Sequence, residues 1–187
     1  LCGKVFDDAL DYAFSLKEEL SATFIHPFDD EKVIAGQGTV GLEILEQLPE
    51  TEVIVSPVGG GGLIAGIAAA VKERNPSVQI YGVEAKACPS MGKSLTENKV
   101  LTVESEPTMA DGIAVKRPGE LTFQLVQKYV DGMLEVDERE IARAMLLLLE
   151  RNKLLVEGAG AVSLAALLSG RFPVKRKKTV AVISGGN

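Results

Sequence analysis

Four consecutive glycines, Gly59 to Gly62, separate an apolar stretch from a segment rich in small residues. The apolar stretch, 53–58, has the continuous hydrophobicity of a strand that is buried on both faces of a sheet. A predicted helix at 63–74 and a second apolar strand at 79–84 follow it, which makes a βαβ unit. Because such crossovers join parallel strands, the chain is predicted to fold around a parallel sheet.

The remainder of the chain continues this alternation of helices and strands. We expect further helices at 7–20, 40–48, 119–130, 138–152 and 158–168, and further strands at 23–26, 133–136 and 179–184. The stretch 88–111 is polar and irregular, and it receives no assignment. The predicted fold class is α/β, with an open, mostly parallel twisted sheet and helices on both of its faces.

Composition excludes several classes of function. Among the 187 residues, 26 acidic side chains outnumber 20 basic ones, and the single basic run, 175–178, is interpreted as a solvated loop, so we expect no nucleic-acid partner. No apolar run is long enough to span a bilayer, so no membrane is expected.

Cys2 and Cys88 lie too far apart in sequence for a metal motif and are expected to be thiols in a reducing compartment, the cytoplasm. The only histidine, His26, excludes a multi-histidine metal site and is expected to be structural.

The glycine run has the properties of a phosphate-binding loop. Without side chains, consecutive main-chain N–H groups can converge on one anion, and the following helix start adds positive dipole. A flexible linker is the alternative, but linkers seldom join an apolar strand to an Ala-rich helix. The run lacks the Gly-Lys-Ser/Thr of a P-loop and the GxGxxG spacing of a dinucleotide fold. A nucleotide-binding module, with Glu84 as its ribose acid, is therefore a weaker interpretation.

A second candidate lies at the end of the chain. The last predicted strand runs into Ser184-Gly185-Gly186-Asn187. Its serine hydroxyl would lie at the carboxyl end of a strand, where open α/β sheets bind ligands. Taken alone, the segment could equally be a simple turn.

The two glycine-containing segments, taken together and in this order, resemble the fold-type II pyridoxal-phosphate enzymes, whose large domain is of the tryptophan synthase β type. Other segments make the chain similar to the threonine dehydratase (threonine ammonia-lyase) and serine racemase family: Phe24-Ile25-His26-Pro27-Phe28-Asp29, Ala35-Gly36-Gln37-Gly38-Thr39, Ala110-Asp111-Gly112 and Val156-Glu157-Gly158-Ala159-Gly160-Ala161. The resemblance covers nearly the whole chain.

The resemblance implies pyridoxal 5'-phosphate as cofactor and a role for each matching residue. Gly59, Gly60, Gly61 and Gly62, with Leu63 beside them, would hold the phosphate. Ser184, with Gly185 next to it, would hydrogen-bond the pyridine nitrogen, and a neutral partner there suits elimination of a β-hydroxyl better than transamination. Glu157 matches an acid near the cofactor, although an acid favoured at a helix start is almost as good an interpretation.

The resemblance also implies a reaction, and it shows what is absent. Family members convert L-threonine to 2-oxobutanoate and ammonia, and L-serine is an expected second substrate. Their Schiff-base lysine lies in a Ser-Phe-Lys-x-Arg-Gly motif, and their substrate carboxylate is held by a Ser-Ser-Gly-Asn-His loop; neither motif occurs here. Because Leu1 is not a methionine, we expect a fragment, with 1–22 as the end of a smaller domain and 23–187 as the larger cofactor-binding domain.

A cation site known in some relatives is only partly matched. Glu84 corresponds to its first acid, but Ser90 replaces the second acid and Cys88 stands where a backbone carbonyl would contribute. One carboxylate is few oxygens for a hard cation, so a solvated acid at the strand end is an equally good interpretation.

Three functional hypotheses follow. The first is a threonine ammonia-lyase of amino-acid metabolism, for example isoleucine biosynthesis, working as a homo-oligomer on a small amino acid. Its alternative within the same class is a serine racemase or serine dehydratase. The second is a non-catalytic domain that binds a phosphorylated ligand, and it describes the isolated 187 residues best because the lysine is missing. The third is the nucleotide-binding module.

Overall fold

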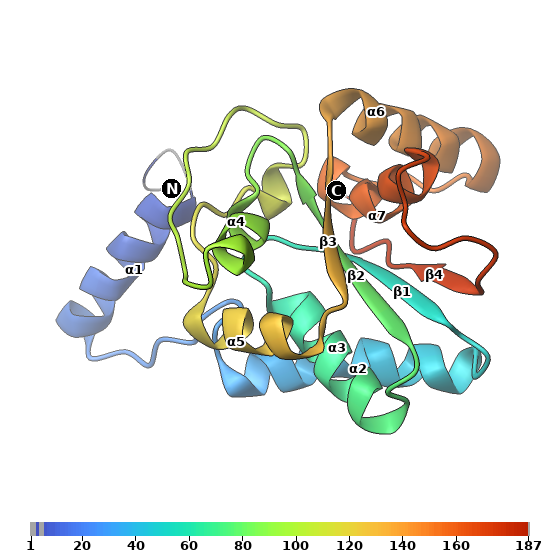
Figure 1. Cartoon of the computed structure of the whole chain (residues 1–187). Helices are drawn as coiled ribbons and strands as arrows, with labels where there is room; N and C mark the ends of the chain where they lie inside the picture. The colour runs from blue at the N-terminus through green and yellow to red at the C-terminus, as the bar shows by residue number, and fades with distance from the viewer. Residues whose placement is uncertain (1–2, 4–5, 187) are drawn as a thin grey trace.

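The computed structural model describes Gly3 and residues 6–186. Its four strands are all parallel and form one sheet in the order β3-β2-β1-β4 (Figure 1). They are β1 (Val53–Pro57), β2 (Gln79–Ala85), β3 (Gly132–Val136) and β4 (Thr179–Ala181). The predicted α/β class with a parallel sheet is therefore confirmed. No helix of the described residues has the length and apolar character needed to cross a membrane.

Helices cover both faces of this sheet (Figure 1). Along β1, Ile54 packs into one core and its neighbours Val53 and Val55 pack into the other. Since successive side chains of a strand point to opposite faces, burial on both sides explains why the strand is apolar throughout. The covering helices are α2 (Glu31–Gln47), α3 (Gly62–Arg74) and α5 (Glu120–Tyr129) on the first face, and α6 (Glu138–Leu147) and α7 (Gly158–Leu168) on the second.

Helix α1 (Phe6–Leu20) lies to one side of the sheet and its covering helices (Figure 1). The Phe14 ring on α1 meets the Phe24 ring at a centroid distance of 4.5 Å. The expected strand at 23–26 is wrong, because this segment pairs with no described strand and leads into a turn instead. In that turn, the Nδ1 atom of His26 accepts hydrogen bonds from the N–H groups of Phe28 and Asp29. The division of the chain at residue 22 stays a prediction.

Helix α2 begins at Glu31, nine residues before the predicted start at Val40. Its N-cap is Asp30, whose carboxylate accepts hydrogen bonds from two N–H groups of the first turn. Gly36 and Gly38 were predicted to precede the helix, but both lie inside it. A Cβ atom on Gly38 would lie 3.1 Å from the carbonyl oxygen of Gly66 on α3, so this glycine permits close packing of the two helices.

The stretch 88–111, unassigned from the sequence, contains α4 (Ser90–Thr96) and the start of a short 3-10 helix, η1 (Asp111–Ile113). The predicted helix at 138–152 is divided into α6 and a π-helical turn, η2 (Leu148–Asn152). Strand β4 ends at Ala181 rather than at residue 184, although the N–H of Val182 still donates to the Val55 carbonyl at 2.9 Å. Ser184 therefore lies beyond the strand.

Two smaller expectations concern the cysteines and the basic run. Cys88 is buried, whereas Cys2, like Asn187, lies outside the described residues. The basic run 175–178 is a loop, as interpreted, and its Lys177 and Lys178 form ion pairs with Glu52 and Glu50.

Candidate functional site

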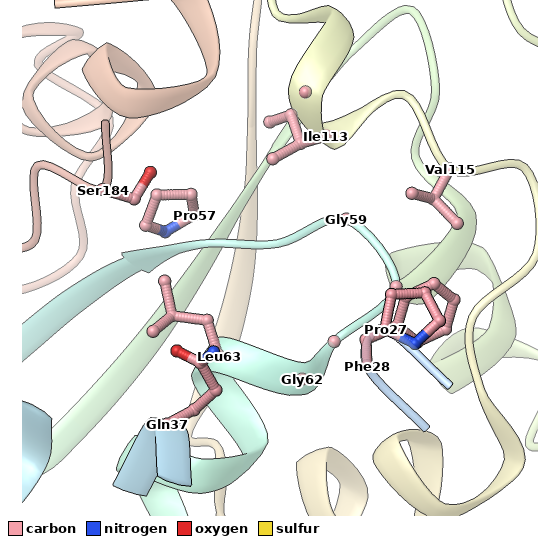
Figure 2. Close-up of a pocket in the computed structure, with 13 residues that line it drawn as sticks. Pro27, Phe28, Gln37, Pro57, Gly59, Gly62, Leu63, Ile113, Val115 and Ser184 are labelled. Atoms are coloured by element: carbon pink, nitrogen blue, oxygen red, sulfur yellow. The ribbon is translucent and has the colours of Figure 1, made fainter. Parts of the chain in front are cut away.

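The segments that follow β1 and β4 meet at one cavity of about 370 Å³. These strands are parallel neighbours, so their carboxyl ends lie at the same edge of the sheet, where open α/β sheets bind ligands. Gly59 to Gly62 and Leu63 line the cavity after β1, and Ser184 lines it after β4. Figure 2 shows Ser184 on one side of the cavity and Phe28 on the other. The structure thus brings together the two segments singled out in the sequence.

The glycine loop is shaped by contacts that leave no room for side chains. Gly61 has a φ of 97°, in the left-handed region that favours glycine. A Cβ atom on Gly60 would lie 2.5 Å from the Phe28 ring. No described residue accepts a hydrogen bond from the N–H groups of Gly59 to Gly62, and α3 begins at Gly62. The loop therefore offers a row of unused donors at the positive end of a helix.

Several residues that line the cavity were not assigned a role from the sequence. Most of them lie within or beside segments that carried the family resemblance, and this position was the only signal that could have identified them. The Val115 carbonyl accepts a hydrogen bond from the buried Ser90 hydroxyl at 2.7 Å, which ties this wall to α4. The unassigned lining residues are Pro27, Phe28, Gln37, Pro57, Gly112, Ile113 and Val115.

Glu157 and Gly185 lie beside the cavity rather than in its lining. The N–H of Glu157, the N-cap of α7, donates to the Gly185 carbonyl at 3.2 Å. A Cβ atom on Gly185 would lie 2.8 Å from the Glu157 carboxylate, and one on Gly160 would lie 2.5 Å from the Gly185 carbonyl oxygen. The start of α7 therefore fixes the backbone next to Ser184. The Ser184 hydroxyl itself is exposed and has no hydrogen-bond partner among the described residues.

Glu84 does not line the cavity, and its surroundings differ from those expected of a metal ligand or a solvated acid. The side chain is buried, and its two carboxylate oxygens accept hydrogen bonds from the N–H groups of Met91 at 2.7 Å and Gly92 at 2.8 Å. Burial raises the pKa of the Glu84 carboxyl to about 7, although these two hydrogen bonds oppose the shift. Within the described part of the chain, no three acidic, histidine or cysteine side chains gather into a possible metal site. The geometry gives no support to a cation at Glu84.

The cavity fits a small phosphorylated ligand. Its volume lies within the range of roughly 300–1,000 Å³ that is typical of ligand pockets. None of the described residues that line it is a lysine or an arginine. The negative charge of a phosphate would therefore be balanced by the loop N–H groups and by the α3 dipole.

A parallel α/β sheet with such a loop at its carboxyl edge is typical of proteins that bind phosphorylated small molecules. Residues 1–185 match the family model described as pyridoxal-phosphate dependent enzyme. The chain belongs to this family, and its cofactor is pyridoxal phosphate.

Individual relatives agree with this assignment. The chain is 56% identical over 185 residues to L-threonine ammonia-lyase of Thermotoga maritima, a match that covers 99% of this chain and 46% of the relative. It superposes with a TM-score of 0.92 on threonine deaminase isoform 2 of Solanum lycopersicum, at 40% identity, covering 99% of this chain and 55% of that one. Maize serine racemase gives the same TM-score at 37% identity, covering 100% of this chain and 58% of that one.

These likenesses confirm the predicted fold-type II architecture and the predicted family. They also show that the chain spans about half the length of the curated relatives it matches.

Proposed function

We propose that this chain is part of a longer protein, called the complete protein below, which is a threonine ammonia-lyase. It would convert L-threonine to 2-oxobutanoate and ammonia, and L-serine to the corresponding oxo acid. The observation that carries the proposal is the single cavity shared by the glycine loop and Ser184. The choice of substrate is supported by relatives at 45–56% identity, which are named L-threonine ammonia-lyase or L-threonine dehydratase.

Within the cavity, each predicted residue has a distinct task. The N–H groups of Gly59 to Gly62 bind the phosphate oxygens, and Leu63 lies beside them in the cavity wall. The Ser184 hydroxyl meets the pyridine nitrogen on a backbone that Gly185 and Glu157 hold in place. When bound, the cofactor supplies an electron sink that loosens the bonds at the substrate's α-carbon. A neutral serine at the ring nitrogen does not stabilise a protonated ring, so it keeps that sink moderate.

The 187 residues by themselves are proposed to bind the cofactor without turning a substrate over. No lysine lines the described cavity, and the motif that carries the family's lysine is absent from the sequence. The base that removes the substrate's α-proton and the groups that bind its carboxylate must come from elsewhere in the complete protein.

Three broader expectations belong to the same proposal: a homo-oligomer, a cytoplasmic location and a role in isoleucine biosynthesis. The last competes with a catabolic role, which is what the name of the Escherichia coli K12 relative states. Growth of a deletion strain without added isoleucine distinguishes the two, because only a biosynthetic enzyme would be required.

The test is an assay of the purified complete protein with L-threonine, with and without added pyridoxal phosphate. We expect cofactor-dependent release of 2-oxobutanoate and ammonia in equal amounts. Absence of both products in the loaded protein would contradict the proposal.

Chiral analysis of an L-serine reaction distinguishes the serine racemase alternative, because a racemase would yield D-serine. The 187-residue chain, assayed in parallel, should bind the cofactor and release no product.

A further inference from the structure

A buried hydroxyl contacts the glycine loop on the side that faces α5 rather than the cavity. Thr122, on the first turn of α5, donates through its hydroxyl to the Gly60 carbonyl at 2.6 Å. The side chain is 0% exposed and does not line the cavity. The Gly119 N–H donates to the same carbonyl at 3.3 Å. The Gly60 carbonyl is thus fixed toward α5, away from any ligand.

This contact determines which way a neighbouring donor points. In a trans peptide, the carbonyl of one residue and the N–H of the next point in opposite directions. With the Gly60 carbonyl held toward Thr122, the N–H of Gly61 is turned to the other side of the loop. A Cβ atom on Gly61 would lie 2.9 Å from the Thr122 Cβ atom, so the α5 side of the loop is closely packed. The side that remains open is the one that lines the cavity.

Asp29 in turn fixes the start of α5. Its carboxylate accepts hydrogen bonds from the N–H groups of Glu120, Leu121 and Thr122, each at 3.0 Å. The preceding residue, Phe28, is the one whose ring packs against Gly60. One dipeptide therefore holds both the helix that carries Thr122 and the loop that Thr122 contacts.

We propose that Thr122 is a positioning residue for the phosphate-binding loop. Its hydroxyl orients the Gly60–Gly61 peptide so that the Gly61 N–H faces the cofactor phosphate. The inference rests on the proposed function, because it takes the ligand of the loop to be that phosphate. It predicts that Thr122 affects binding of the phosphate group without affecting binding of the pyridine ring.

The experiment uses the complete protein freed of cofactor, as wild type, Thr122→Val and Thr122→Ser. Dissociation constants are measured for pyridoxal phosphate and for pyridoxal, which lacks the phosphate. Thr122→Val keeps the shape and removes the hydroxyl, so its affinity for pyridoxal phosphate should fall about 3- to 10-fold, the effect of one neutral hydrogen bond. Its affinity for pyridoxal should stay the same. Thr122→Ser, which keeps the hydroxyl, should bind both ligands like wild type.

The remaining possible results would each overturn the inference or the proposed phosphate site. An equal loss for both ligands in Thr122→Val would show a merely structural role, and no loss for either would show that the hydroxyl is dispensable; both overturn the inference. If the valine variant does not fold, Thr122→Ala removes the same hydroxyl without adding a methyl group and is judged by the same criteria. If wild type itself binds pyridoxal as tightly as pyridoxal phosphate, the proposed phosphate site fails, whatever the variants do.

Discussion

The Asp29 carboxylate accepts a hydrogen bond from the main-chain N–H of Thr122 at 3.0 Å, across 93 positions of the chain. Asp29 is not part of α5, yet it satisfies N–H groups that the first turn of any helix leaves without a partner. Side-chain oxygens normally do this from the N-cap residue, which here is Gly119, without a side chain. The glycine is required because a Cβ atom there would overlap Asp29.

Replacing Asp29 by alanine should therefore destabilise the chain by about 0.5–2 kcal/mol, the range for loss of a helix cap. The free energy of unfolding in urea measures the effect. Asp11→Ala, an exposed aspartate on α1, is the matched control and should change stability little. Equal effects of the two substitutions would show that the contact from Asp29 to α5 contributes nothing.

Two glycines only thirty positions apart should respond in opposite ways to alanine. A Cβ atom on Gly66 would overlap the Ile34 carbonyl of α2, a backbone atom that cannot turn away. Gly66→Ala should therefore destabilise the chain by about 1–3 kcal/mol through overpacking. Gly36 is exposed on α2 with nothing within 4 Å of its added Cβ atom, so Gly36→Ala should stabilise by about 0.5–1 kcal/mol. Thermal melting of both variants tests the pair, and a stabilised Gly66→Ala would contradict the packing of α2 on α3.

Glu84 should make stability fall as pH rises. Its carboxyl has a pKa of about 7 when folded, against an ordinary value of 4.5. Between these values the folded state keeps a proton that the unfolded state has released. The free energy of unfolding therefore decreases with pH in this window, by at most about 1.4 kcal/mol per pH unit, and levels off above pH 7.

Glu84→Gln removes this titration, so the stability of wild type relative to Glu84→Gln should decline from pH 4.5 to 7. Urea unfolding at several pH values measures the difference. Glu104→Gln, at an exposed glutamate, should follow the wild-type profile. Parallel profiles for wild type and Glu84→Gln would show that the buried carboxyl does not titrate in this window.

Ser184→Ala should weaken the binding of pyridoxal phosphate to the complete protein by about 3- to 10-fold, because one hydrogen bond to the ring is lost. The exposed Ser184 makes no other hydrogen bond within the described chain, so stability should not change. Titration of the cofactor-free protein measures the affinity. Ser15→Ala on α1 is the control and should bind like wild type; if the two variants bind equally, Ser184 does not contact the cofactor.

The sequence was sufficient for the features that depend on local pattern. The continuous apolar runs around Val55 and Ile80 identified buried parallel strands, and the glycine run after β1 identified the loop. Local pattern was not sufficient for features that depend on which elements become neighbours, and only the family resemblance implied that Ser184 and the loop share a ligand. That β4 lies beside β1, and so brings Ser184 to the loop, is a property of the strand order.

Two differences between the expected and the observed structure have the same origin. The helix was predicted to start after Gly36 and Gly38, but Gly38 lies inside α2 where this helix packs closely on α3. Glu84 looks like a strand-end acid open to solvent, but it is buried against the start of α4, a helix that the polar stretch did not reveal. In both cases a tertiary contact, absent from any local pattern, decides the role of the residue.

The proposed function requires that the cavity holds pyridoxal phosphate with its phosphate at the glycine loop and its ring at Ser184. The most direct measurement is a crystal structure of the complete protein with bound cofactor. We expect phosphate oxygens within about 2.7–3.2 Å of main-chain nitrogens in Gly59 to Gly62, and the pyridine nitrogen within hydrogen-bonding distance of the Ser184 hydroxyl. A cofactor bound with its phosphate away from this loop, or with its ring nitrogen facing another group, would contradict it.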